Sequence, residues 1–303
     1  MLNKIKTNSL LLLLISSQLL LTGCNPATIK QSKMDTDNHE IEAILQIAGH
    51  KVTSAEDAFE KATKAMHDGD MDLAQLYFVK GYNLEPDNIK ILTKLTELYI
   101  NLKKYELAEL GIKLMLEQNP SNAKTLEQYG LLLIQTGNYA DAEDNLNKAV
   151  SLDQSWSAYN GLGIIANLLG DPEKAENLFR QADSLFPNSP ELLNNIGFSL
   201  YSAKKLDQAE AYYLQALAID PNFKKAAYNY ALLQARLKNY DKAYFSFSKQ
   251  STTAEAYNNT GYIAMINGDY KEAKNYFEEA IHATPFYYKK ANDNLAELNR
   301  LDN

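Results

Sequence analysis

Cysteine is almost absent from this sequence, and proline and glycine are scarce. The single cysteine, Cys24, excludes an internal disulfide and any zinc site built from several thiolates. Only 8 prolines and 13 glycines are spread over 303 residues, whereas tyrosine occurs 20 times. Sandwiches of short strands need many turn residues, so this composition favours long helices.

Basic runs are also lacking, and the formal net charge is −8. An acidic chain without a cluster of lysines and arginines cannot neutralise phosphates, so nucleic acid is not an expected partner. The apolar run Leu10–Leu21 has 12 residues. A spanning helix needs about 20 apolar residues, so this run is too short to be one.

Residues 1–23 have the three-part pattern of a secretory signal peptide. Lys4 and Lys6 form a basic start, Leu10–Leu21 is the apolar core, and the small residues Thr22 and Gly23 lead to Cys24. The chain is therefore expected to enter the secretory route.

The stretch "LTGC", Leu21–Cys24, resembles the lipobox of bacterial lipoproteins. The resemblance implies that Cys24 is acylated and that residues 1–23 are removed. One acyl chain binds membranes only marginally and several hold firmly, so a multiply acylated Cys24 would be a stable membrane anchor. An ordinary signal peptide that happens to contain a cysteine is the alternative.

Asn25 bears on which membrane would hold the anchor. In well-studied enterobacterial lipoproteins, aspartate after the cysteine favours retention in the inner membrane, and most other residues permit transfer outward. By that analogy Asn25 indicates the outer membrane, with the chain facing the periplasm. Residues 24–54 are polar and are interpreted as a tether, in which a short helix over Ile41–Ala48 is allowed.

The rest of the sequence is repetitive, with a period close to 34 residues. Seven alanines are separated by 34, 34, 33, 34, 34 and 30 residues, namely Ala74, Ala108, Ala142, Ala175, Ala209, Ala243 and Ala273. The residue twelve places before each alanine is small in six of seven cases, and Thr96 is the exception. The residue four places after each alanine is bulky and apolar. A small residue recurs seven places later, except at Met115 and Gln250. Spacings of four and three keep these side chains on one helix face.

This pattern resembles the tetratricopeptide repeat (TPR). The resemblance implies an all-α fold, a right-handed α-solenoid of about seven helix-turn-helix repeats over 55–285 with a capping helix over 286–303. No repeat buries its apolar face alone, so stability comes from stacking. Gly-Asp pairs such as Gly170–Asp171 are expected at the turns within repeats, and prolines such as Pro187 after the second helices.

The sixth repeat is four residues short, and the usual ending with proline is missing there. The chain runs from Gln250 through Ser251, Thr252 and Thr253 directly into the seventh repeat. We expect a short second helix or a tight turn, and a local change of superhelical angle.

Patterns for catalysis are lacking. "GLGIIA", Gly161–Ala166, has the letters of a dinucleotide-binding loop, but Gly163 falls on the small repeat position inside a first helix. The four histidines are scattered and are interpreted as solvated surface residues. The expectation is a protein that is not an enzyme, with no cofactor, metal site or small-molecule substrate. An enzyme with an unrecognised active site is the alternative, which would need clustered titratable residues in the folded groove.

Protein binding is the remaining function, because TPR solenoids line a concave groove with their first helices. Groove-facing positions lie three residues before, one residue after and four residues after the small residue of each first helix. From repeat four onward they give Asn160, Ile164, Asn167, Asn194, Phe198, Tyr201, Tyr228, Leu232, Ala235, Asn258, Tyr262 and Met265. Such a surface suits a peptide with apolar anchors whose backbone bonds to asparagine amides. The alternative is that several of these residues pack between repeats. Phe59 and Thr63 do not fit the carboxylate clamp of some chaperone-binding TPR domains, so that ligand is not expected.

Residues Asn258–Leu295, with "GYIAMINGDY" and "FYYKKA", resemble the C-terminal part of the TadD family, the TPR lipoproteins of Tad (Flp) pilus assembly. The resemblance implies a pilotin-like role in delivering, assembling or stabilising the outer-membrane secretin of the pilus. The alternative is an envelope adaptor of the NlpI kind, which brings hydrolases or proteases to their substrates.

Overall fold

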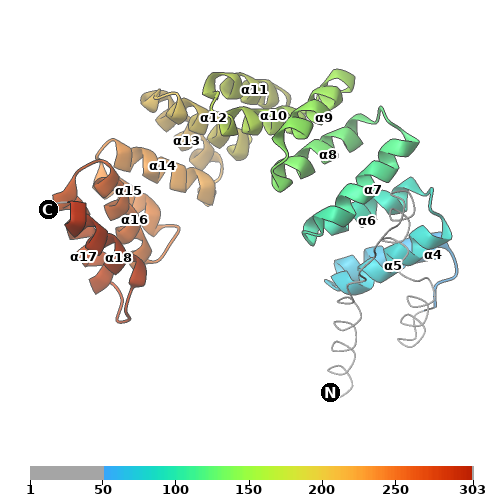
Figure 1. Ribbon diagram of the computed structural model, residues 1–303, viewed down its shortest axis with the longest axis horizontal. Coiled ribbons are helices and arrows are strands. Elements are labelled where there is room, and N and C mark those ends of the chain that lie inside the picture. The colour runs from blue at the N-terminus through green and yellow to red at the C-terminus, as the bar shows by residue number, and fades with distance from the viewer. Residues whose placement is uncertain (1–50, 302–303) are drawn as a thin grey trace, which may run out of the picture. The chain divides into compact units, whose positions relative to one another are not determined.

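A computed structural model describes residues 51–301 (Figure 1). The expected signal peptide, the acylated Cys24, Asn25, the helix over Ile41–Ala48 and the last two residues of the capping segment lie outside the described residues. The chain divides into two compact parts, which meet in sequence after Gln118.

Every regular element within residues 51–301 is an α-helix, which confirms the all-α prediction. The N-terminal part contains α4 (Ala55–His67), α5 (Met71–Leu84), α6 (Ile89–Asn101) and α7 (Tyr105–Gln118). The C-terminal part contains α8 (Ala123–Thr136), α9 (Tyr139–Leu152), α10 (Trp156–Leu168), α11 (Pro172–Leu185), α12 (Pro190–Ser202), α13 (Leu206–Ile219), α14 (Lys224–Arg236), α15 (Tyr240–Ser248), α16 (Thr253–Ile266), α17 (Tyr270–His282) and α18 (Lys289–Leu301). None of these described helices is long and apolar enough to cross a membrane.

The helices form seven helix-turn-helix pairs followed by α18, as the TPR pattern predicts. In repeats three, four, five and seven, a glycine of the first helix makes room for the ring or branched side chain of the second. In repeat four, an added Cβ on Gly163 would lie 2.5 Å from Cε1 of Phe179, whose side chain is fully buried. Gly197 against Tyr213 and Gly261 against Phe277 repeat the arrangement. The two backbones therefore approach as closely as glycine permits.

Each pair turns at a left-handed residue. Gly170 has φ +81°, Asp171 accepts a hydrogen bond from the Lys174 amide at 3.0 Å, and Pro172 starts α11. This confirms the turn expected at Gly170–Asp171, with Asp171 as the cap of α11 and Pro172 at its first position. Three other repeats place a lysine in the left-handed conformation, at Lys103, Lys204 and Lys238. The sequence pattern did not predict these positions, because lysine carries no turn signal.

Repeat six has the short second helix that its four missing residues predict. Helix α15 has 9 residues, whereas the other second helices have 13 or 14. Helix α16 begins soon afterwards with a capping box, in which Thr252 and Glu255 bond to each other's backbone amides at 3.3 and 3.0 Å. The bond from the Thr252 amide lowers the pKa of Glu255. The change of superhelical angle stays a prediction.

Helix α18 packs where the first helix of an eighth repeat would stand. Ala291 and Leu298 are buried, and Leu298 joins the core of repeats six and seven. Phe286 and Tyr287 precede the helix and are exposed, so the capping helix starts at Lys289 and not at residue 286.

Candidate protein-binding groove

The first helices of the C-terminal part contact one another in order along the chain. Contacts run from α8 to α10, α12, α14, α16 and α18, while each second helix packs between two first helices. The groove residues expected from the sequence therefore lie on successive neighbouring helices. Their placement divides them into three groups.

Three aromatic residues form the exposed group. Phe198 on α12, Tyr228 on α14 and Tyr262 on α16 are 41%, 45% and 44% exposed. No ring contact involves Phe198 or Tyr262 among the described residues, whereas Tyr228 meets the Phe247 ring edge-on at 5.2 Å. These side chains offer aromatic area to a partner without first breaking a core.

Four apolar candidates are half-buried and pack against cores. Ile164 and Tyr201 pack on the core of repeats four and five, and Leu232 and Met265 on that of repeats six and seven. Ala235 is fully buried. These residues hold the first helices in place, as the alternative interpretation of the groove anticipated. Their contact with a partner stays a prediction.

The asparagine candidates form a ladder between helices. The side-chain oxygen of Asn160 accepts from Asn195 at 2.8 Å, that of Asn194 from Asn229 at 2.9 Å, and that of Asn258 from Asn294 at 2.9 Å. All three acceptors are at most 7% exposed. Asn167 likewise bonds to Ser199, at 3.0 Å. Buried amides must be paired, so these residues set the register of neighbouring repeats before they bind anything else.

Tyr228 interrupts the ladder. It occupies the place that Asn160, Asn194 and Asn258 hold in repeats four, five and seven. Tyr228 has no amide oxygen to accept the hydrogen bond that each of these asparagines accepts. Its ring packs edge-on against the Phe247 ring instead. The groove surface therefore changes from amide to aromatic at α14.

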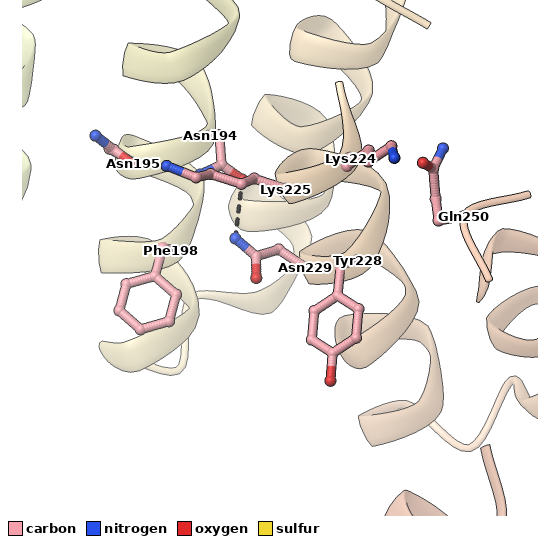
Figure 2. A pocket seen from close by; sticks show the side chains of 8 residues that line it. All are labelled: Asn194, Asn195, Phe198, Lys224, Lys225, Tyr228, Asn229 and Gln250. Atoms are coloured by element: carbon pink, nitrogen blue, oxygen red, sulfur yellow. Dashed lines mark hydrogen bonds between the residues drawn. The ribbon is translucent and has the colours of Figure 1, made fainter. Parts of the chain in front are cut away.

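A depression of about 500 Å³ lies at this interruption (Figure 2). Phe198 and Tyr228 stand on either side of the Asn229–Asn194 hydrogen bond, and Lys224 and Lys225 come from the first turn of α14 (Figure 2). The full lining is Asn194, Asn195, Phe198, Lys224, Lys225, Tyr228, Asn229 and Gln250. Neither Lys224 nor Lys225 makes an ion pair with a described residue. The depression therefore combines aromatic faces with unpaired positive charge.

Sequence reasoning missed five of these lining residues: Asn195, Lys224, Lys225, Asn229 and Gln250. A signal for two of them was present, because Asn195 and Asn229 both stand two places before the small residue of their helix. Lys224 and Lys225 stand at the start of α14, before the positions that recur from repeat to repeat, so the repeat pattern did not point to them.

Titratable groups with shifted pKa values lie at structural contacts. Burial and a hydrogen bond to Asp269 raise the pKa of Tyr240 to about 12. Burial raises the pKa of Glu176, but bonds from Arg180 and Lys205 outweigh it and lower the pKa overall. Within residues 51–301, no three metal-ligating side chains gather at one place.

Models of the tetratricopeptide repeat match residues 129–190, 190–223 and 254–287. Among curated proteins, the chain is similar to the photosystem I assembly protein Ycf3 of Rippkaea orientalis, with 30% identity over 154 residues. That match covers 43% of this chain and 86% of Ycf3. The chain belongs to the tetratricopeptide repeat family, and no catalytic family is indicated.

Longer relatives share only part of their length with this chain. The BBSome complex member BBS4 of Bos taurus is 25% identical over 277 residues, which cover 88% of this chain and 50% of BBS4. The crystal structure of a TPR protein from Parabacteroides merdae superposes with a TM-score of 0.61 at 18% identity, covering 80% of this chain and 98% of that one. This likeness shows the fold alone. The chain is a TPR scaffold for protein–protein interaction.

Proposed function

We propose that the chain is a non-enzymatic, lipid-anchored scaffold in the assembly of a Tad/Flp-type pilus or secretion machine. In this proposal it acts as a pilotin toward an outer-membrane secretin. The acylated Cys24 holds it in the outer membrane, facing the periplasm, and the first-helix groove holds the partner. Support comes from the "LTGC" lipobox and from the resemblance of Asn258–Leu295 to the TadD family.

The observation that carries the binding role is the row of exposed aromatic residues on adjacent helices. Phe198, Tyr228 and Tyr262 come from α12, α14 and α16, and Lys224 and Lys225 lie beside the first two. An extended or helical segment with apolar anchors would cover the rings, and its carboxylates would meet the lysines. The Asn229–Asn194 hydrogen bond of the asparagine ladder keeps α12 and α14 in register, so Phe198 and Tyr228 are presented at fixed spacing.

Deleting the gene in its host tests the role in secretin assembly. We expect most secretin multimers to disappear from the outer-membrane fraction, because a pilotin delivers or stabilises them there. Envelope fractions would be separated by density and probed for the secretin. Restoration by the wild-type gene is the control for effects on neighbouring genes.

Unchanged secretin multimers in the deletion strain would contradict the proposal. If the deletion instead altered the recruitment of a hydrolase or protease while the secretin stayed in place, the chain would be an envelope adaptor. Neighbouring genes for a secretin, a pilus ATPase and small pilins would favour the pilus role.

A further inference from the structure

The short sixth repeat leaves an apolar notch between α13, α14 and α15. The notch has a volume of about 470 Å³. Its lining includes Leu214 and Leu217 of α13, Tyr230 of α14, Phe245 of α15, and Lys249 and Gln250, which follow α15. Gln250 stands where repeats three, four, five and seven have a fully or nearly fully buried alanine on the last turn of the second helix. Helix α15 ends at Ser248, so that last turn is missing and the space beside α13 stays open.

Phe245 is the only aromatic residue at its place in the repeat. It lies two residues after Ala243, where repeats three, four and seven have the polar Asp144, Asn177 and Asn275, repeat five has Ala211, and repeats one and two have Leu76 and Leu110. Its side chain is 60% exposed. Helix stacking does not require a phenylalanine at an outward position, so the repeat fold leaves this ring unexplained.

Leu214 shows the same exchange on the adjacent second helix. It lies five residues after Ala209, where repeats two, three, four and seven have Lys113, Asn147, Arg180 and Glu278. It is 46% exposed. Two independent outward positions are therefore apolar on neighbouring helices, and both line the notch.

Positive charge lies at the notch. Lys249 places its ammonium 4.3 Å from the centre of the Phe245 ring, and Lys242 also lines the notch. Neither lysine has an ion-pair partner in the described chain, whereas Lys148 and Lys174 on other second helices pair with carboxylates at 2.6 and 2.8 Å. Of the nearby acids, Asp241 accepts from Tyr276 and Glu210 from Gln234.

We propose that the notch is a second protein-binding site, for a polypeptide segment that carries one bulky apolar side chain flanked by aspartate or glutamate. The apolar side chain covers Phe245 and Leu214, and the carboxylates pair with Lys242 and Lys249. Charge complementarity selects this occupant, since the two lysines are unpaired in a chain whose net charge is −8. The site differs from the depression at α14 in every lining residue except Gln250, which lines both.

A peptide selection with counter-selection tests the notch. A phage-displayed library of random dodecapeptides is bound to the full-length chain in detergent, after depletion on the variant Leu214→Asn with Phe245→Asn. Asparagine stands at the place of Leu214 in repeat three and at the place of Phe245 in repeats four and seven, so the helices should tolerate both substitutions. We expect survivors with an aromatic or leucine side chain flanked by acids.

Binding of the selected peptides is then measured by fluorescence polarisation. Phe245→Asn should weaken it about tenfold or more, because an aromatic anchor loses its contact. Lys242→Glu with Lys249→Glu should weaken it also and remove the preference for acids. The control variant Phe198→Ala with Tyr262→Ala, on the groove, should leave the affinity within about twofold.

Three outcomes would overturn the proposal: no peptide survives the depletion, the survivors show no enrichment of acids, or their affinity is unchanged by Phe245→Asn. Circular dichroism checks the fold of each variant. If Phe245→Asn perturbed folding, the charge-reversal pair decides, and unchanged binding by that pair would overturn the proposal. Neither result bears on the first-helix groove, so the two sites are tested independently.

Discussion

Replacing Phe179 with alanine is expected to lower the free energy of unfolding by about 3–5 kcal/mol. The ring is fully buried between α10 and α11 and packs directly beneath Gly163. Removing it leaves a cavity that two helices at their closest approach cannot fill without moving. Urea denaturation followed by helical circular dichroism measures the loss, which corresponds to a fall in Tm of roughly 10 °C.

A double variant tests whether Gly163 and Phe179 form one packing unit. In the wild type, Gly163→Ala would place Cβ 2.5 Å from the Phe179 ring and force it to shift. In the Phe179→Ala background that clash is gone, and alanine gains about 1 kcal/mol of helix propensity over glycine. We expect a coupling free energy of at least about 1 kcal/mol.

Phe245→Ala is the matched control, because its ring is 60% exposed. It should change the free energy of unfolding by no more than about 0.5 kcal/mol. Additive effects of Gly163→Ala and Phe179→Ala, or equal losses for Phe179 and Phe245, would contradict the packing derived from the repeat.

Replacing Cys24 with serine is expected to move the chain from the membrane fraction to the soluble periplasmic fraction. Serine offers no thiol for acylation, and the described helices contain no segment that could span a membrane in its place. Carbonate-washed membranes and soluble extract would be compared by immunoblot, with the wild type alongside.

Asn25→Asp is the control for which membrane is used. By the enterobacterial analogy it should stay membrane-bound but shift toward the inner membrane. If Cys24→Ser fractionates with membranes as the wild type does, Cys24 is not the anchor and the signal peptide is an ordinary one.

The repeat architecture could be predicted from the sequence because each constraint is local and periodic. The pairing of Gly163 with Phe179 follows from a 34-residue period with small and bulky residues at fixed places. The nine-residue α15 followed from the four missing residues, since a shorter repeat must lose a helical turn or its linker. Lys103, Lys204 and Lys238 at turns could not be predicted, because tertiary packing imposes a conformation that lysine does not prefer.

The groove could be predicted only in part. The rule that gave Phe198 and Tyr262 also gave Asn194, whose side-chain oxygen is taken by Asn229 of the next repeat. Position along a helix determines which face a residue occupies. The pairing of Asn194 with Asn229 also depends on how α12 and α14 are aligned, and these two residues are 35 apart in the sequence. Lys225 was missed because it stands at a helix start, outside the regular positions.

Binding of the purified secretin shows most directly whether the first-helix groove holds this partner. The affinity of the full-length chain in detergent would be compared with that of Phe198→Ala with Tyr262→Ala, by surface plasmon resonance on immobilised secretin. We expect the double variant to keep its helical content and Tm but to bind at least about tenfold more weakly, because two exposed aromatic anchors are lost. Equal affinity of the wild type and the double variant, or no binding of the secretin by the wild type, would contradict this expectation.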